Sequence, residues 1–317
     1  MREIGGFFGI ELGNRKNNYH KDGLYLNTGR GCLNLIIHNL EIRKLYVPYY
    51  TCDSLLSPLK ENNIPFEYFG INKQLEINRE IELEMGDYII YINYFGIKSS
   101  YVKHLLNQYS NKIIIDNTQA FFEKRYNNVN SFNSARKFFG VPDGACLYST
   151  FVAREKFHPN SKIKYDYLIE RLIGDRDKSY QKYKDYEKNI SNDIYLISTL
   201  SNKLLMNIDY NYVKLKRRLN YNHYNSILGS YNSFELNDLN EEVPLCYPFL
   251  PTKEIDKSFF FENKIFLPTY WTEVLDREGS GYDFEKMLSK YLLPLPVDQR
   301  YNLEDITYVS ERVLELL

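Results

Sequence analysis

The sequence predicts an α/β protein with a mostly parallel central sheet, flanking helices and a small α+β unit at the carboxyl end. Up to Tyr148, short β-branched and aromatic runs alternate with segments of helical spacing, which is the order of a doubly wound sheet. A polar stretch over residues 230–242 separates this pattern from shorter strands and a terminal helix. We therefore predict a large domain at residues 1–229 and a small domain at residues 230–317.

The composition excludes several classes of protein. The chain has 317 residues, of which 44% are hydrophobic, and this is enough to fill a large core. Because 40 Lys and Arg residues oppose 41 Asp and Glu residues, we expect no overall attraction for nucleic acid or an anionic membrane. The apolar runs are too short to span a bilayer and the start is not a signal peptide, so a cytoplasmic protein is expected. The 4 scattered cysteines predict neither a structural metal nor a disulfide framework.

The first elements predicted are an arm over residues 1–13 and a capped helix within Leu24–Leu40. The arm mixes glycines with large apolar residues, which suits a segment that crosses a surface. The helix should begin near Thr28, and its first amides would be free to bind an anion. Gly29 allows close approach of the backbone, so Thr28, Gly29 and Arg30 are candidates for binding a phosphate. Many helices begin in this way without a ligand.

Strands and helices alternate in the next part of the chain. Strands are predicted at Lys44–Val47, Pro65–Phe69, Tyr88–Ile92 and Ile113–Asp116, and helices over 53–62 and Val102–Tyr109. Asp53 is the expected N-cap of the first of these helices. Alternation of this kind favours parallel strands joined by helical crossovers.

The stretch from Lys112 to Tyr148 carries the residues that point to chemistry. Asp116 ends a buried strand, and ligands of open α/β sheets bind at the carboxyl ends of strands. Lys137 follows in a loop, before a Val-Pro-Asp-Gly turn and the strand Ala145–Tyr148. Pyridoxal 5'-phosphate needs an amine that holds it covalently and a carboxylate against its pyridine nitrogen. Lys137 and Asp116 can supply these two groups.

Two further residues of this stretch could contact the same cofactor. Gln119 would lie one turn after Asp116 if residues 117–122 begin a helix, and it could then reach the ring. Ser134 could donate its hydroxyl to the phosphate. The alternative is structural, because an Asp at a strand end is often a helix N-cap and a Lys beside an Arg is usually solvated.

Four segments resemble the DegT/DnrJ/EryC1/StrS aminotransferases, which are fold-type I enzymes that act on nucleotide-linked keto-sugars. They are LNTGRG, DNTQAFF, SARKFFGVPDGA and LPVDQRY. The resemblance implies that Asp116 pairs with the pyridine nitrogen, that Gln119 lies near the ring hydroxyl and that Lys137 holds the cofactor. It also implies an amino acid donor such as glutamate, a keto-sugar acceptor and a role in surface polysaccharide or other glycan biosynthesis. A C2 homodimer with sites at the subunit interface is implied as well.

The sequence departs from this family at the residue that stacks on the cofactor ring. Family members commonly have an aromatic residue or a histidine there, whereas this chain has Cys52. Tyr50 is therefore the candidate for stacking, and core packing is its equal alternative. By the same resemblance, Asn192 is the candidate for reaching the phosphate of the partner subunit's cofactor.

The rest of the chain predicts helices and then a small mixed unit. Residues 151–189 are charged and rich in tyrosine, which indicates exposed helix or a mobile excursion. Helical spacing recurs over 194–205 and over 213–228, where Arg217 and Arg218 are expected on the polar side. Arg300 could meet a substrate carboxylate or phosphate, or form a structural ion pair. The final elements are expected at Leu245–Leu250, Lys264–Leu267, Leu292–Val297 and, as a helix, Asn302–Leu316.

Two other functions remain open at this point. Some relatives of the same fold are sugar dehydratases, and these have histidine in place of the lysine, so Lys137 favours amino transfer. A non-catalytic protein that binds pyridoxal phosphate as a sensor or scaffold belongs to a different class. The combination of Asp116, Gln119, Ser134 and Lys137 argues against it.

Overall fold

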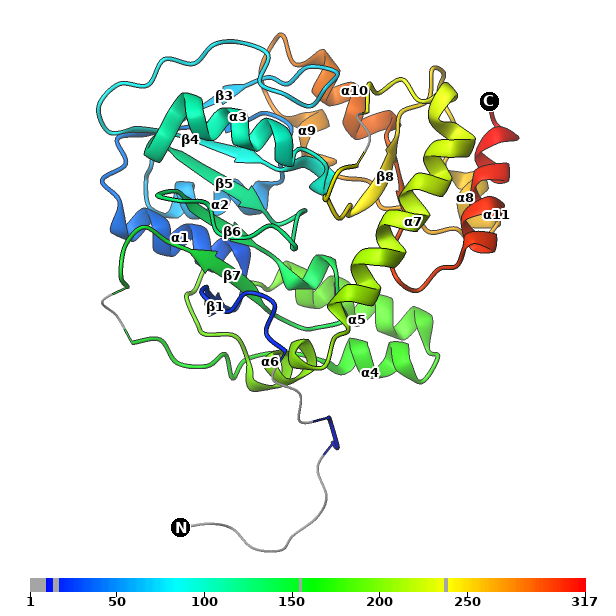
Figure 1. Cartoon of the computed structure of the whole chain (residues 1–317), viewed down its shortest axis with the longest axis horizontal. Coiled ribbons are helices and arrows are strands. Elements are labelled where there is room, and N and C mark those ends of the chain that lie inside the picture. Colours follow the sequence, from blue (N-terminus) through cyan, green and yellow to red (C-terminus); the bar gives the residue numbers. More distant parts are fainter. Residues whose placement is uncertain (1–9, 14–16, 154–155, 237–238) are drawn as a thin grey trace, which may run out of the picture.

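The computed structural model describes residues 10–13, 17–153, 156–236 and 239–317. Among these residues, a seven-stranded sheet has the order β1-β7-β6-β5-β4-β2-β3, and β8 pairs with β9 in a second sheet (Figure 1). Strands β3, β2, β4, β5 and β6 run parallel, and β7 is antiparallel to both of its neighbours. This confirms the mostly parallel sheet. The strands are β1 Leu24–Leu26, β2 Lys44–Pro48, β3 Phe66–Phe69, β4 Asp87–Ile92, β5 Ile113–Asn117, β6 Asn130–Asn133, β7 Ala145–Tyr148, β8 Cys246–Phe249 and β9 Leu293–Pro296.

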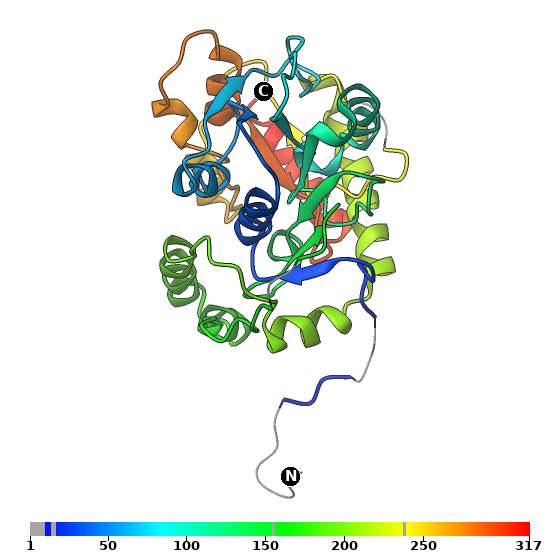
Figure 2. The same cartoon turned by 90° about the vertical axis from the view of Figure 1, so that its left-hand side faces the viewer.

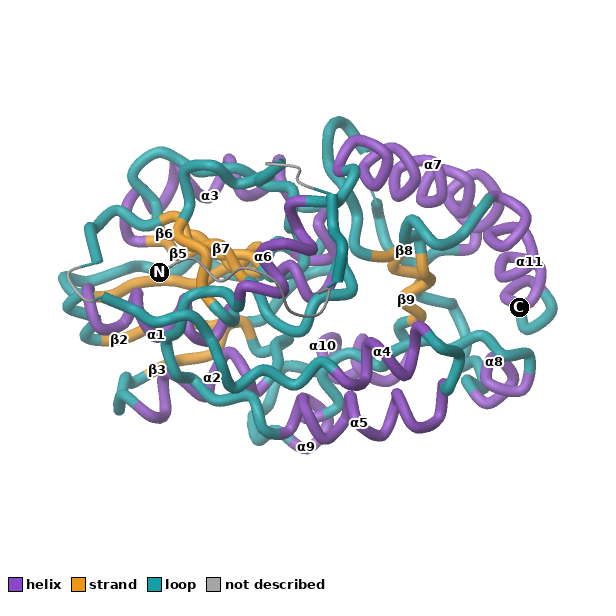
Figure 3. Tube along the Cα trace, turned by 90° about the horizontal axis from the view of Figure 1, so that it is seen from below, coloured by secondary structure: helices purple, strands orange, loops and turns teal. Residues whose placement is uncertain are grey.

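Helices cover both faces of the large sheet. Figure 3 shows α3 on one side of the strands and α1 and α2 on the other, as expected for helical crossovers between parallel strands. Within the described residues, no helix is both long and apolar enough to cross a membrane. The helices are α1 Gly29–Asn39, α2 Asp53–Glu61, α3 Ser99–Tyr109, α4 Asp166–Leu172, α5 Arg176–Lys188, α6 Thr199–Met206, α7 Tyr210–Leu228, α8 Ser258–Glu262, α9 Glu273–Asp276, α10 Asp283–Tyr291 and α11 Leu303–Leu314.

The central strands are apolar on both faces because helices bury both faces. Ile113, Ile114 and Ile115 of β5 have no exposed surface, and Ile89 and Ile90 of the neighbouring β4 have none either. Each side chain of this kind stabilises the fold by roughly 2 kcal/mol relative to exposure. The continuous apolar run that predicted these strands is thus the consequence of two-sided burial.

Helix α7 contributes to two of the hydrophobic clusters. Near its start, Tyr210 and Val213 pack with residues that surround Phe138. Near its end, Tyr221 and Tyr224 pack with β8, β9 and α11, and Figure 3 shows α7 and α11 side by side. Residues of α9 and α10 belong instead to the core of the large sheet. The proposed boundary between residues 229 and 230 stays a prediction.

The charged segment after β7 forms a helical hairpin. Helices α4 and α5 pack against each other, and Figure 2 shows this pair at the lower left. Tyr167 of α4 stacks on Tyr186 of α5 with ring centroids 5.6 Å apart, and the hydroxyl of Ser179 donates to the carbonyl of Tyr167. Of the two alternatives for residues 151–189, helix is found over 166–172 and 176–188.

Three expectations about local structure were wrong. Residues 117–122 do not begin a helix: Asn117 ends β5 and turns follow it, because the carboxylate of Asp116 accepts from the amide of Thr118 and Ala120 N donates to the carbonyl of Asn117. The helix expected over 194–205 begins only at Thr199, since residues 195–197 form hydrogen bonds beside β1. Lys264–Leu267 is not a strand, because Lys264 has φ of 57° and Ile265 N closes the end of α8 on the carbonyl of Phe260.

Smaller differences concern the start of α2 and the amino-terminal arm. The N-cap of α2 is Cys52, and Asp53 is the first residue of the helix, where its carboxylate accepts from Arg277. Residues 1–9 of the expected arm lie outside the described residues, and residues 10–13 have no regular structure.

A buried histidine joins three elements behind the lysine loop. His20 is fully buried, with Nδ1 2.7 Å from the hydroxyl of Tyr148 and Nε2 2.7 Å from the carbonyl oxygen of Phe121. A proton on Nε2 suits the carbonyl, which only accepts, and Nδ1 can then accept from the tyrosine; Nε2 also lies 2.9 Å from Nδ2 of Asn133. Burial and, to a smaller extent, the charge of Lys124 together lower the pKa of His20 to about 3.

This histidine makes the protein less stable in acid. A pKa that is lower in the folded state than in the unfolded chain stabilises the fold above about pH 6.5, and this stabilisation is lost as the pH falls toward 3. Between about pH 7.5 and pH 5, the wild type should lose about 2 kcal/mol more unfolding free energy than His20→Gln. Urea denaturation at both pH values measures this difference. His104→Gln, exposed on α3, should behave like the wild type, and equal pH dependence of all three proteins would contradict the prediction.

Candidate active site

Asp116 lies at the carboxyl end of β5, between β4 and β6. Its neighbours across the sheet are Ile92 and Phe132, and the side chain is 5% exposed. Its Oδ1 accepts from the amide of Thr118 at 2.8 Å. Burial raises the pKa of Asp116, whereas the charge of Lys137 and the hydrogen bonds of Thr118 lower it. A buried carboxylate in this position requires a cationic partner to be stable in its ionised form.

Lys137 lies beside Asp116 and is exposed at the end of a short 3₁₀ turn, Ala135–Lys137. Its Nζ donates to the hydroxyl of Thr118 at 3.4 Å, and Thr118 is the residue that also binds Asp116. The predicted lysine and carboxylate therefore meet at one residue. The turn that follows is fixed by Gly144, whose φ is 126° and whose carbonyl accepts from Ala135 N at 2.9 Å.

Gln119 presents an unpaired donor in the same region. The side chain is fully buried, and its Oε1 accepts from the amide of Phe95 at 2.7 Å. Nε2 has no hydrogen-bond partner among the described residues. Phe95 has φ of 55°, a strained value for a residue with a side chain, so the loop after β4 is held tightly against Gln119. An unpaired buried donor costs about 1–3 kcal/mol, which a ligand oxygen at this position would recover.

The start of α1 faces the same group of residues. Thr28 caps the helix by accepting from the amide of Gly31 at 2.9 Å. A Cβ on Gly29 would lie 3.0 Å from the Cγ2 of Thr118, which shows how closely the backbone approaches the site. Ser134 is 7% exposed and its hydroxyl makes no hydrogen bond within the described part of the chain. Free amides and a free hydroxyl are suitable donors to a phosphate.

Tyr50 and Cys52 take different places after β2. Tyr50 is fully buried and packs edge-on against Trp271, with centroids 4.5 Å apart, and beside Tyr94. Its stacking role stays a prediction. Cys52 is partly exposed, and its pKa is raised by burial and lowered by the charge of Lys137. The thiol thus lies within the electrostatic reach of Lys137.

Asn192 is held by the first two helices of its own chain. Its amide donates to the hydroxyl of Ser57 at 2.8 Å and to the carboxylate of Glu61 at 2.5 Å. Its carbonyl accepts from the side chain of Asn34 at 3.0 Å. The role proposed for Asn192 toward a partner subunit stays a prediction.

Asp143 has a structural role that sequence reasoning missed. It is fully buried, and its carboxylate accepts from the hydroxyl of Ser198 at 2.6 Å and from the side chain of Asn160 at 3.1 Å. The Val-Pro-Asp-Gly turn after Lys137 is thereby fixed to the start of α6. The signal in the sequence was a Pro-Asp-Gly turn, which does not reveal the distant partners.

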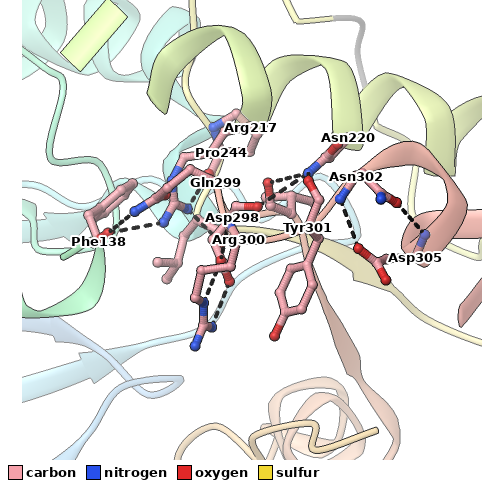
Figure 4. A network of polar contacts seen from close by, with 12 residues as sticks. Phe138, Arg217, Asn220, Pro244, Asp298, Gln299, Arg300, Tyr301, Asn302 and Asp305 are labelled. Carbon is pink, nitrogen blue, oxygen red and sulfur yellow. Dashed lines mark hydrogen bonds and ion pairs between the residues drawn. The ribbon is translucent and has the colours of Figure 1, made fainter. Parts of the chain in front are cut away.

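The residue after Lys137 is anchored by a second polar network (Figure 4). The carbonyl of Phe138 accepts from Arg217 at 3.4 Å and from Nε2 of Gln299 at 3.1 Å. Arg217 is 2% exposed, so the expectation that it lies on the polar side of its helix was wrong. The reason is that it also donates to two backbone carbonyls before β8, at 3.1 and 3.2 Å. Arg300 forms a two-point ion pair with Asp298, the structural alternative for this residue.

The arrangement is that of an α/β protein whose candidate site lies at the carboxyl ends of parallel strands. No family model and no curated protein sequence matches the chain. Solved structures do match: a DegT/DnrJ/EryC1/StrS aminotransferase from Brucella abortus has 14% identity and a TM-score of 0.62, over 92% of this chain and 85% of that chain. The sugar aminotransferase CalS13 from Micromonospora echinospora has 12% identity and a TM-score of 0.63, over 92% of this chain and 87% of that chain. The GDP-4-keto-6-deoxy-D-mannose-3-dehydratase of E. coli with bound hydrated PLP has 14% identity and a TM-score of 0.62, over 92% of this chain and 87% of that chain.

The chain therefore has the fold of these fold-type I structures, which confirms the fold class expected from the sequence. The two aminotransferases and the dehydratase share this one fold. Fold likeness at this level of identity does not distinguish between their reactions.

The buried Arg217 should be essential for stability. Arg217→Met would leave the carbonyls of Pro244, Leu245 and Phe138 with fewer donors, at about 1–3 kcal/mol for each carbonyl left unpaired. We expect a loss of about 3 kcal/mol or more in the free energy of unfolding, measured by urea denaturation. Arg218→Met is the matched control, because the adjacent arginine lies near the surface and should cost less than about 1 kcal/mol. Equal losses in both variants would contradict this prediction.

Proposed function

We propose that the protein is a pyridoxal phosphate-dependent aminotransferase that moves an amino group from an amino acid donor to a keto-sugar. One observation carries this proposal: the carboxylate of Asp116 and the amine of Lys137 meet at Thr118, beside the unpaired amide of Gln119. The ends of parallel strands provide this position in open α/β sheets.

The residues present fit the cofactor. Lys137 would hold it covalently, Asp116 would face the pyridine nitrogen and Nε2 of Gln119 would donate to the ring hydroxyl. Its phosphate would be bound by the start of α1 and Ser134, through the residues Thr28, Gly29, Arg30 and Ser134. When bound, pyridoxal phosphate supplies an electron-withdrawing ring that stabilises negative charge at the α-carbon of the donor.

Asp116 and Lys137 would have complementary tasks. Because Asp116 is buried, its ionised form gains most from a protonated ring nitrogen at close range, and it would keep that nitrogen protonated. Lys137 is exposed, so its amine can exchange with an incoming amino group. Once released, this amine would remove the proton from the donor's α-carbon as a general base and return a proton as a general acid.

The substrates and the setting are inferred from the neighbours in fold. Solved structures of this fold include sugar aminotransferases and a dehydratase that acts on a GDP-linked keto-sugar. They support a nucleotide-linked keto-sugar as the acceptor. Glutamate as the donor, a C2 homodimer with sites at the interface, a cytoplasmic location and a role in surface polysaccharide or other glycan biosynthesis belong to the same proposal.

A sugar dehydratase is the second candidate, because the E. coli enzyme shares the fold. Lys137 favours amino transfer over dehydration, since the related dehydratases carry histidine at this position. A non-catalytic sensor or scaffold would bind the cofactor without converting it.

Borohydride reduction of the protein loaded with pyridoxal phosphate should fix the cofactor to Lys137, as located by peptide mass spectrometry. Lys137→Ala should still bind the cofactor non-covalently but lose transamination by about a hundredfold or more, because proton transfer by a positioned group contributes this much. Lys124→Ala, in the same stretch but over the ring of Tyr19, is the control and should keep its activity. Cofactor fixed at another lysine, or undiminished turnover of Lys137→Ala, would overturn the assignment.

The loaded protein should be yellow and should lose this colour when glutamate is added. Colour that persists with every amino acid tested would favour the sensor. Mass spectrometry of the sugar product, with a panel of nucleotide-linked 4-keto-6-deoxy sugars, separates the two enzymes. An aminotransferase replaces the keto oxygen by an amine, whereas a dehydratase removes a hydroxyl group.

A further inference from the structure

Two arginines next to the site are anchored on the same end of α5. Arg136 directly precedes Lys137, and its guanidinium forms an ion pair with Glu187 and lies 5.5 Å from the ring centroid of Tyr186. Nη1 of Arg30 donates to the carbonyl of Ile190 at 2.7 Å. Since α5 ends at Lys188, the two guanidiniums contact positions that lie about one helical turn apart.

These contacts close a ring around the start of α1. Gly29 lies against Thr118, and Thr118 accepts from Lys137. Arg136 is the residue directly before Lys137. Arg136 then contacts Glu187 near the end of α5, and Arg30, which belongs to α1, contacts Ile190 just after that end. The amides of Gly29 and Arg30, the first two of the helix, have no carbonyl of that helix to bind.

The ring of contacts contains more cationic side chains than carboxylates. Among the described residues, Glu187 is the carboxylate that pairs with Arg136, and Arg30 pairs with none. The side chain of Arg136 is 15% exposed, and its Nε is buried without a hydrogen-bond partner among the described residues. The pKa of Arg30 is lowered, first by burial and then by the charge of Arg136, as expected for two nearby cations. An anion between them would offset their repulsion.

We propose that Arg136 binds the phosphate of the cofactor and exchanges its ion pair with Glu187 for that phosphate. This inference rests on the proposed function and adds a phosphate ligand to it. A guanidinium offers two parallel N–H donors that match phosphate oxygens, and it lies one residue from the lysine that would hold the cofactor.

The exchange follows from charge. A phosphate dianion and the carboxylate of Glu187 on one guanidinium would repel each other, so the binding of one displaces the other. Glu187 belongs to the α4–α5 hairpin, whose Tyr180 and Tyr183 are 58% and 41% exposed. The neighbouring Tyr186 is buried and donates its hydroxyl to the carbonyl of Pro142 at 2.8 Å, so α5 would stay in place while the side chain of Glu187 turns away.

The test compares two aldehydes that differ by the phosphate. Dissociation constants of pyridoxal phosphate and of pyridoxal are measured by absorbance titration of the full-length protein. Arg136→Gln should weaken binding of pyridoxal phosphate by about ten- to hundredfold, the value of a charged hydrogen bond, and leave pyridoxal within about twofold. Arg136→Lys keeps the positive charge but not the two parallel N–H donors, so it should weaken binding of pyridoxal phosphate by an intermediate factor. It also serves as a second variant in case Arg136→Gln misfolds. An equal loss for both aldehydes in either variant would overturn the role of Arg136.

A second pair of variants tests the exchange. Glu187→Gln should tighten binding of pyridoxal phosphate by about threefold or more, because the competing carboxylate is gone, and should not change pyridoxal. Glu170→Gln is the matched control: it removes a carboxylate of the same hairpin that pairs with Lys178 and Lys182, and it should change neither constant. Weaker binding in Glu187→Gln would overturn the exchange. Failure of the proposed function looks different, because the wild type would then attach neither aldehyde at Lys137.

Discussion

The hydrogen bonds that the carbonyl of Phe138 accepts from Arg217 and Gln299 hold the lysine loop against two distant parts of the chain. Lys137 itself is exposed, so its position depends on its neighbours. Phe138 is fixed on one side, and Ala135 is fixed on the other by the carbonyl of Gly144. The exposed amine is thus carried by a backbone that is bound at both ends, which is the condition for a preorganised reactive group.

The parts of the site that were predictable from sequence depend on local pattern. The apolar run of β5 is continuous because both faces are buried, and it therefore indicated where the strand ends and where Asp116 lies. The cap at Thr28 and the Val-Pro-Asp-Gly turn were recognisable for the same reason. Strand ends, caps and turns depend on neighbours in the sequence, and so the candidate residues of the site could be named without the fold.

The parts that were not predictable depend on distant partners. Arg217 has the pattern of a polar helical surface, but its acceptors come from residues 27 and 79 positions away. A Lys beside an Arg is usually solvated, and no local pattern reveals that Arg136 pairs with Glu187 on another helix. The turns after Asp116 arise because its side chain binds the backbone of Thr118, and this choice cannot be distinguished from a helix N-cap by residue type alone. Identity of 10–14% with solved structures of the same fold has a related cause, since apolar cores accept many sequences of similar volume and pattern.

The anchoring of Phe138 also sets the order in which the protein can mature on the ribosome. Its two donors lie 79 and 161 residues further along the chain. A growing chain can form β5 and the loop of Lys137 early, but it cannot fix that loop until first Arg217 and then Gln299 have emerged. The large sheet can therefore be assembled while Lys137 is still unanchored, and firm binding at this loop should be acquired only after Gln299 has been added.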